Sequence, residues 1–355
     1  MTGFVNADFW KGKRVFLTGH TGFKGGWAAL WLQQMGAIVK GFSLPPPTTP
    51  SLFEQAQVAD GMESEFGDIR DLAAITTSMV AFNPDILIHM AAQPLVRLSY
   101  REPVETYATN VMGTVHVLEA ARKCPNLKAI VNITTDKCYE NREWEWGYRE
   151  NEPMGGHDPY SNSKGCAELV TSAYRKSFFS APGTPALASV RAGNVIGGGD
   201  WAQDRLLPDA VRAWEKGATL HIRRPQATRP WQHVLEPLAA YLRLAQRLWE
   251  SPALAGAYNF GPLPHEAATV KNVIELASTA YPASATSYEN ESEGPHEAGW
   301  LALETAHARQ VLGVAPHWSL NTAVARTMNW YRQQHGGADA RALCLADIDA
   351  WEARP

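Results

Sequence analysis

A series of glycines at the end of the first apolar run constrains the fold of this chain more than any other feature. Residues 14–19 (RVFLTG) predict a buried strand and residues 25–35 (GGWAALWLQQM) predict a helix. Between them Gly19, Gly22 and Gly25 follow the spacing G-x-x-G-x-x-G. At such a junction the first glycine permits a tight turn, the second lets a pyrophosphate approach backbone amides, and the third allows close helix packing. The stretch therefore predicts a dinucleotide-binding unit rather than an ordinary turn.

Short apolar runs then alternate with amphipathic ones. The runs that predict strands are residues 38–43, 85–90, 129–134 and 186–192, and those that predict helices are 71–82, 103–123 and 159–179. A further strand is expected just before Asp68. This alternation predicts an α/β fold, a Rossmann-type doubly wound parallel sheet with helices on both faces.

The alternation ends after Ala192. Residues 193–208 and 223–233 are rich in glycine, proline or basic side chains, which predicts loops. A helix (234–250), a short strand (256–261) that would rejoin the sheet, and a helix (320–334) follow. We expect a dinucleotide-binding domain over 1–192, rejoined by 234–261. Residues 193–233 and 262–355 would form a smaller mixed C-terminal lobe that binds the substrate.

Bulk properties exclude several classes of protein. The net charge of -4 and the pI near 6.3 give no sign of binding to nucleic acid or to anionic membranes. No apolar run approaches the roughly 20 residues of a membrane helix, and the first residues lack the features of a signal peptide. We therefore expect a cytoplasmic protein.

Neither disulfides nor a metal site is expected. Paired spacing is absent from the four cysteines, Cys124, Cys138, Cys166 and Cys344. The pairs His265-Glu266 and His296-Glu297 lack the second histidine of a zinc motif.

Residues 134–165 gather titratable groups after an apolar run and before a helix. Tyr160 and Lys164 are four residues apart, so they share one helix face. An ammonium beside a phenol lowers the phenol pKa, which would make phenolate accessible near neutral pH. Alone, Tyr-x-x-x-Lys more often indicates surface chemistry. After a glycine series and a strand that ends in Thr134-Thr135, it favours proton transfer.

Together these motifs resemble a known family. The glycine loop, HMAAQP at 89–94, the threonines and the Tyr/Lys pair resemble the extended short-chain dehydrogenase/reductases. Thr135-Asp136-Lys137 resembles a triplet of the sugar-nucleotide 4,6-dehydratases, most of which carry Thr-Asp-Glu. The lysine variant, with GHTGFKG, ENREWEWGYRENEPMGG and RPWQHVLEPL, resembles the CDP-glucose 4,6-dehydratases over nearly the whole chain.

The resemblance implies NAD as cofactor and a nucleotide sugar, CDP-glucose, as substrate. Tyr160 would take the proton of the C4 hydroxyl while hydride leaves C4, and Lys164 would hold the phenolate and the nicotinamide ribose. Thr135 would bind the C4 oxygen. Asp136 would protonate the departing C6 hydroxyl, which requires a carboxylic acid. The hydride then returns to C6.

Lys137 departs from the common triplet. The resemblance implies that in relatives with Thr-Asp-Glu the glutamate removes the C5 proton. A lysine at this position can remove that proton only as a neutral amine, which requires a depressed pKa. Alternatively, Lys137 stays charged and stabilises the enolate while another group or Tyr160 acts as base. A plain surface cation is the third reading.

We expect a cofactor site that runs from the glycine loop to the Tyr/Lys pair. The acid that usually binds the ribose is missing, since Ser43 stands near that position and the next acid is Glu54. That residue therefore does not decide between NAD and NADP. Asp68 would contact adenine or, equally, cap the next helix. The expected cofactor residues are Gly19, Thr21, Gly22, Phe23, Gly25, Asp68, Ile69, Ala91, Ala92, Thr134, Tyr160, Lys164 and Arg191.

We expect the substrate to cross the carboxyl ends of the strands. Gln93, Arg97 and Ser99 would bind it or scaffold their loop. One of Arg223, Arg224 and Arg229 would bind phosphate, whereas His233 and Asn259 fit a structural role better. The expected substrate residues are Gln93, Arg97, Ser99, Asn194, Asp204, Arg205, Arg223, Arg229 and Asn259.

Other readings remain at this stage. The resemblance implies a homodimer or homotetramer paired through helices 103–123 and 159–177. From the sequence alone, these helices would equally serve just to cover the sheet. A nucleotide-sugar 4-epimerase or a reductase would share Tyr160 and Lys164, but neither needs an acid such as Asp136. A dinucleotide sensor without catalysis would need no ionisable phenol. Nothing in the residues excludes UDP, dTDP or GDP as the nucleotide.

Overall fold

The computed structural model describes residues 4–263, 266–282, 285–289 and 299–353, and a seven-stranded sheet forms its centre. The strand order is β11-β6-β5-β4-β1-β2-β3 and every neighbouring pair is parallel. The strands are β1 (Arg14–Thr18), β2 (Ile38–Ser43), β3 (Glu63–Phe66), β4 (Ile86–His89), β5 (Ala129–Ile133), β6 (Ala186–Ala192) and β11 (Ala257–Phe260). The predicted strands are confirmed, including the return of residues 256–261 to the sheet.

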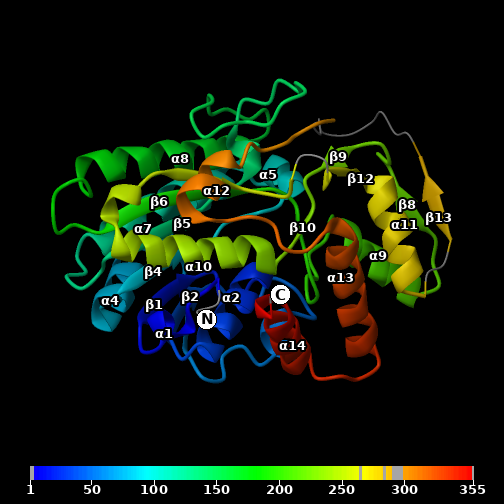
Figure 1. Cartoon of the computed structure of the whole chain (residues 1–355), viewed down its shortest axis with the longest axis horizontal. Helices are drawn as coiled ribbons and strands as arrows, with labels where there is room; N and C mark the ends of the chain where they lie inside the picture. The colour runs from blue at the N-terminus through cyan, green and yellow to red at the C-terminus, as the bar shows by residue number, and fades with distance from the viewer. Residues whose placement is uncertain (1–3, 264–265, 283–284, 290–298, 354–355) are drawn as a thin grey trace.

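Helices cover both faces of the sheet, as predicted (Figure 1). One face packs against α2 (Phe23–Gln34) and α10 (Leu235–Glu250) within the larger apolar core. The other face carries α4 (Leu72–Phe82) and α7 (Gly113–Ala121), with α8 (Pro159–Ser177) beside them. Strands buried on both sides explain why their sequences are almost continuously apolar. The fold is a Rossmann-type doubly wound α/β sheet.

The predicted helix over 103–123 is interrupted. It begins as α6 (Pro103–Tyr107), widens into a π-helical turn, η1 (Ala108–Met112), and continues as α7. Buried Asn110 lies in the wide turn, and its carbonyl accepts a hydrogen bond from the Thr114 hydroxyl at 2.7 Å. π-Helical turns of this kind often occur at functional sites.

A smaller mixed lobe lies to one side of the sheet (Figure 1). Its elements are α9 (Leu206–Glu215), β8 (Leu220–Ile222), α11 (Val270–Ala280) and β13 (Thr286–Tyr288). The loop predictions were wrong where α9 starts and at three two-residue strands, because pairing with other segments orders these strands. They are β7 (Val195–Ile196), which pairs with β10 (Gln232–His233), and β9 (Thr228–Arg229), which pairs with β12 (Ala268–Thr269).

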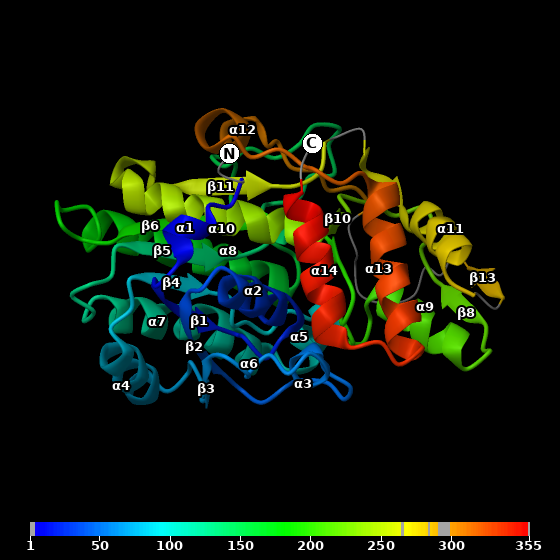
Figure 2. The ribbon, with the colours of Figure 1, turned by 60° about the horizontal axis from the view of Figure 1, so that its bottom comes forward.

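The C-terminal part contains a helix that the sequence analysis missed. The predicted helix 320–334 is confirmed as α13 (Leu320–His335), and α14 (Ala340–Glu352) follows it. α14 lies beside α2, far away in sequence (Figure 2). The ring centroids of Trp31 and Trp351 are 5.4 Å apart, and the Trp31 indole donates to Glu352 at 2.8 Å. The last helix thus covers the first long one.

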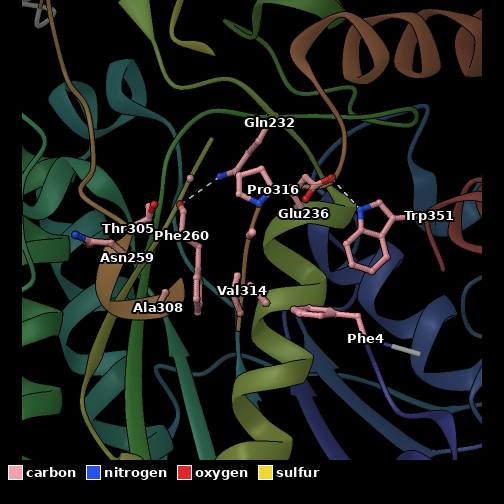
Figure 3. Close-up of a pocket in the computed structure, with 13 residues that line it drawn as sticks. Phe4, Gln232, Glu236, Asn259, Phe260, Thr305, Ala308, Val314, Pro316 and Trp351 are labelled. Carbon is pink, nitrogen blue, oxygen red and sulfur yellow. Dashed lines mark hydrogen bonds between the residues drawn. The ribbon is translucent and has the colours of Figure 1, made fainter. Parts of the chain in front are cut away.

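A small cavity lies between α10, β11 and the C-terminal segment (Figure 3). Glu236 at its wall accepts hydrogen bonds from the Trp351 indole at 2.9 Å and from the backbone of His317 and Trp318. Asn259 is the one expected site residue that lines this cavity, so we assign the cavity a packing role.

The remaining short elements are α1 (Ala7–Trp10), α3 (Leu52–Gln55), α5 (Val96–Arg101), η2 (Asp136–Cys138), η3 (Pro252–Leu254) and α12 (Ala306–Leu312). Within the described ranges no helix has both the length and the apolarity to cross a bilayer.

Candidate active site

The site lies where the strand order reverses. From β1 the chain moves outward through β2 and β3, then returns to β4 on the other side of β1 and continues through β5 and β6. Ligands of doubly wound sheets bind in the crevice that this reversal opens at the carboxyl ends of the strands. The glycine loop, the HMAAQP segment and the Thr-Asp-Lys triplet all follow strands that end there.

The glycine loop is shaped to admit a phosphate. Gly19 has φ of +80°, and a Cβ there would lie 2.8 Å from the backbone nitrogen of Ala91. At Gly25 a Cβ would lie 2.0 Å from the Gly19 carbonyl oxygen, so the helix can approach only with glycine. Gly22 is the N-cap of α2, and no side chain bonds to the amides of that first turn. These free amides suit the pyrophosphate of a dinucleotide.

No acid lies at the end of β2, as the sequence indicates. The Thr21 hydroxyl lies 2.8 Å from the Ser43 hydroxyl and donates to the Leu44 carbonyl at 2.8 Å. His20 beside them is buried, which lowers its pKa to about 4, and its Nε2 lies 2.8 Å from the Ser64 hydroxyl. This corner is therefore neutral and held by hydroxyl groups.

Asp68 does not cap the next helix. That role belongs to Asp71, whose carboxylate accepts from the amides of Ala73 and Ala74. Asp68 instead pairs with Arg70 at 2.6 Å, and the hydrogen bond from Arg70 lowers the Asp68 pKa. A contact between Asp68 and adenine stays a prediction. The expected cofactor residue Ile69 is buried, as part of the core that includes α7.

Gln93 and Ser99 scaffold their loop. The Gln93 side chain donates to the Leu95 carbonyl at 3.1 Å and to the Thr106 hydroxyl at 2.9 Å, and it accepts from the Leu95 amide. The Ser99 hydroxyl donates to the Val96 carbonyl at 2.6 Å and accepts from the Tyr160 amide at 3.1 Å. Both side chains are occupied within the protein, which favours the scaffolding alternative.

A buried chain of hydrogen bonds starts below the glycine loop. The Thr18 hydroxyl accepts from the amides of Met90 and Ala91, each at 3.1 Å, so its proton goes to His89 Nδ1 at 2.7 Å. The proton of His89 is then on Nε2, 3.3 Å from the Thr114 hydroxyl. Burial, with a smaller effect of the Lys164 charge, lowers the His89 pKa to about 3. His89 is thus a neutral connector.

The chain continues through Asn110 to the catalytic helix. The Asn110 amide donates to the Ser163 hydroxyl at 2.9 Å and to the Gln93 carbonyl at 3.1 Å, and it accepts from the Gln93 amide. Ser163 donates to the Tyr160 carbonyl at 2.7 Å. These residues position the start of α8. The sequence analysis did not single out Asn110, because its role depends on contacts with two distant segments.

Tyr160 and Lys164 both face the carboxyl end of β5. Burial raises the Tyr160 pKa to about 12, although a hydrogen bond with Thr135 and the charge of Arg205 oppose this rise. Burial lowers the Lys164 pKa to about 8, and its ammonium donates to the Ile133 carbonyl at 3.4 Å. The lowered phenol pKa that the spacing predicted is wrong for the protein alone, because desolvation of the phenolate outweighs the nearby charges.

Asp136 and Lys137 are neighbours on η2, where Asp136 is buried and Lys137 is half-buried. Burial raises the Asp136 pKa against the charge of Lys137, and burial lowers the Lys137 pKa against the charge of Asp136. The Asp136 Oδ1 accepts from Thr135 at 3.0 Å, while Oδ2 has no hydrogen-bond partner among the described residues. Lys137 is half-buried rather than fully exposed, which disfavours the reading of a plain surface cation.

Thr134 and Arg191 are occupied by a buried network rather than facing the cofactor crevice. Thr134 donates to Glu168 at 2.5 Å and to the Val190 carbonyl at 2.9 Å. Arg191 pairs with Glu168 at 2.8 Å and donates to the Tyr139 hydroxyl at 2.7 Å. These bonds join β5, β6 and α8, so both residues support the site from below.

Two arginines from the segment after β6, Arg205 and Arg229, act on the site through their charges. The charges of Arg205 and Arg229 both lower the Lys137 pKa, after the larger effect of burial. Arg205 also donates to the Pro94 carbonyl at 3.3 Å, and Arg97 lies 3.7 Å from the Asp204 carboxylate. Three arginines, Arg223, Arg224 and Arg229, were expected near phosphate. Among them, Arg229 is the one whose charge lowers the Asp136 pKa, against the larger effect of burial.

Other predicted residues take structural positions. Asn259 accepts from the Tyr139 hydroxyl at 2.7 Å and donates to the Tyr148 carbonyl at 2.8 Å. His233 is buried, which lowers its pKa to about 3, and packs against Trp318. Asn194 and Arg223 are partly exposed on loops, with no ligand role demonstrated. In the described part of the chain no cluster of three potential metal ligands occurs; His265, His296 and Glu297 lie outside it.

The sequence of this chain is similar to those of known nucleotide-sugar enzymes. The family model "GDP-mannose 4,6 dehydratase" matches residues 16–327. A CDP-glucose 4,6-dehydratase from Salmonella typhimurium is 54% identical over 94% of this chain and 95% of that protein. A UDP-glucose 4-epimerase from Mycolicibacterium smegmatis is 25% identical over 90% of this chain and 99% of that protein.

The fold also matches solved structures. A UDP-glucose 4-epimerase from Stenotrophomonas maltophila, with bound NAD and formylated UDP-arabinopyranose, superposes with a TM-score of 0.80. It is 18% identical and covers 92% of this chain and 100% of its own. The family model and the 54% identical relative together confirm the resemblance drawn from the motifs. The chain belongs to the GDP-mannose 4,6 dehydratase family.

Proposed function

We propose that this protein is an NAD-dependent CDP-glucose 4,6-dehydratase, which removes water from CDP-glucose to give CDP-4-dehydro-6-deoxyglucose. The observation that carries the proposal is the buried Asp136 carboxyl, with a raised pKa and an unpartnered Oδ2 beside Lys137. A 4-epimerase or a reductase has no leaving hydroxyl to protonate, so it gains nothing from such an acid. The 54% identical relative, a CDP-glucose 4,6-dehydratase, supports both the reaction and the nucleotide.

The residues present fit NAD. The free amides at the start of α2 and the absence of a Cβ at Gly22 leave room for a pyrophosphate. The neutral corner formed by Thr21 and Ser43 carries no cation that would hold a 2′-phosphate, which favours NAD over NADP. When bound at this loop, NAD would supply the hydride acceptor for C4 of the sugar and the hydride donor for C6.

The protein residues supply the proton steps. Tyr160 accepts the C4 hydroxyl proton, which requires that its raised pKa fall in the loaded complex. The Lys164 ammonium would hold the resulting phenolate. Thr135 holds the C4 oxygen. The ketone then acidifies the C5 proton. Asp136 gives its proton to the leaving C6 hydroxyl, and burial favours the protonated carboxyl by raising its pKa.

We assign the sugar nucleotide to the second lobe. The charges of Arg205 and Arg229 both act on Lys137, so one or both of these arginines would bind the pyrophosphate of the substrate. The lobe would comprise residues 193–233 together with part of the chain after 262, while α14, packed on α2, supports the dinucleotide-binding sheet.

The activity is tested by incubating the purified protein with CDP-glucose and NAD. The expected product is an alkali-sensitive 4-keto sugar nucleotide, formed faster from CDP-glucose than from UDP-, dTDP- or GDP-linked sugars. Conversion to the C4 epimer without a keto product would instead identify an epimerase. Equal rates with all four nucleotides would contradict the assignment of CDP.

Lys137→Arg separates the two possible roles of Lys137. Burial lowers the Lys137 pKa and the charges of Arg229 and Arg205 lower it further, so we favour the neutral amine as C5 base. Arginine keeps the charge but cannot act as a base at neutral pH. We therefore expect Lys137→Arg to be as inactive as Lys137→Ala, with C4 oxidised and no solvent deuterium entering C5. Substantial activity of Lys137→Arg would show that the charge is what matters.

The exposed face of α6 to α8 would pair two copies of the chain. Val104, Met112 and Leu169 are 76%, 48% and 60% exposed there, which is unusual for apolar side chains on neighbouring helices. Leu169→Glu should therefore convert a dimer into a monomer in analytical ultracentrifugation. Phe178→Glu, at the far end of α8's exposed surface, is the matched control. A monomeric unmodified protein would refute the pairing.

A further inference from the structure

A second lysine–tyrosine pair lies beside the site. Lys24, in the first turn of α2, donates to the Tyr241 hydroxyl on α10 at 3.0 Å, and its ammonium lies 5.1 Å from the centroid of that ring. Tyr241 is buried. Neither residue has a task in the reaction as described above.

The pair approaches the reacting groups from the opposite face of the sheet. Lys24 follows Gly22 and Phe23 of the phosphate loop, and the charges of Lys164 and Asp136 both act on it. The Tyr241 pKa, raised mainly by burial, is raised further by Asp136 and Tyr160. α2 and α10 pack on one face of the sheet, whereas Tyr160 comes from α8 on the other. The two phenols thus come from helices on opposite faces of the sheet, and Lys24 lies at the start of α2 directly after the glycine loop.

Lys24 is a half-buried cation, and in the described residues no carboxylate forms a salt bridge with it. Its one hydrogen bond there goes to the Tyr241 phenol. Burial, together with the charges of Lys164 and Arg205, lowers the Lys24 pKa to about 7, while the Asp136 charge opposes this shift. A cation beside the crevice that has no salt bridge to a carboxylate is a candidate for serving a ligand.

We infer that Lys24, held in place by Tyr241, shifts the balance of the bound cofactor from its oxidised toward its reduced form. The oxidised nicotinamide ring is positively charged and the reduced ring is neutral, so the protonated Lys24 disfavours only the oxidised form, and most strongly below its pKa of about 7. This makes the first oxidation of the sugar more favourable. The inference rests on the proposed NAD site.

The test compares the dissociation constants of NAD⁺ and NADH, measured by calorimetry on the intact protein. Lys24→Met, which keeps the length but removes the charge, should weaken NADH relative to NAD⁺ by about tenfold. Lys24→Arg should stay near the unmodified ratio. Tyr241→Phe should shift the ratio of the two dissociation constants in the same direction, but by a smaller factor. This variant replaces Lys24→Met as the test if Lys24→Met does not fold. Lys11→Met, on an exposed lysine, is the control.

The outcomes separate this inference from the proposed function. An unchanged ratio in Lys24→Met and Tyr241→Phe overturns the inference. An equal loss of both affinities also overturns it, because that result makes Lys24 a partner of the phosphates. Failure of the unmodified protein to bind either form would refute the proposed NAD-dependent function itself.

Discussion

Tyr160→Phe is expected to lower the turnover of CDP-glucose by about 10²–10⁴-fold, because the variant lacks the group that accepts the C4 hydroxyl proton. Cofactor and substrate binding should remain nearly intact, since the hydrogen bonds that position this turn use the backbone of Tyr160 and not its phenol. Single-turnover absorbance of reduced nicotinamide measures the loss directly.

The matched control is Tyr100→Phe, because that phenol is 42% exposed on α5. Its turnover should equal that of the unmodified protein. If Tyr160→Phe reduces the cofactor at a normal rate, Tyr160 is not the base, and the neutral Lys164 amine, with its pKa near 8, becomes the candidate.

Asp136→Asn is expected to separate the two halves of the reaction. An amide keeps the shape of the carboxyl but cannot transfer a proton to a leaving hydroxyl, so elimination should stop while oxidation at C4 continues. Reduced nicotinamide should then accumulate on the enzyme together with a 4-keto-glucose nucleotide. Overall turnover should fall by about 10²–10⁴-fold, the usual contribution of a general acid.

The accumulated species can be identified by quenching the reaction and examining the sugar by mass spectrometry. Asp8→Asn, at an exposed position of α1, should dehydrate normally. Normal dehydration by Asp136→Asn, or the absence of any reduced cofactor, would remove Asp136 from the mechanism.

The sheet and the position of the site were predictable because they depend on local signals. Strands buried on both faces must be apolar throughout, and a turn with positive φ at Gly19 that also touches Ala91 admits only glycine. The Thr-Asp-Lys triplet and the Tyr/Lys pair lie close to those signals in sequence. Their convergence therefore followed from the order of strands and helices.

What escaped prediction depends on distant contacts. The amphipathic pattern of α14 contains no sign that its partner is α2, and the partner of Lys24 is 217 residues away on α10. The phenol pKa was misjudged because burial cannot be read from spacing. Asp68 and Asp71 both precede the same helix, and only the backbone geometry identifies Asp71 as its cap.

The contact between α14 and α2 can form only after nearly the whole chain has been synthesised. Trp31 leaves the ribosome early, yet the Glu352 that accepts its indole proton follows 321 residues later. Until then the outer side of α2, next to the phosphate loop, stays uncovered by its native partner. A nascent chain therefore carries an exposed aromatic surface for most of its translation, and chaperones are expected to recognise it there.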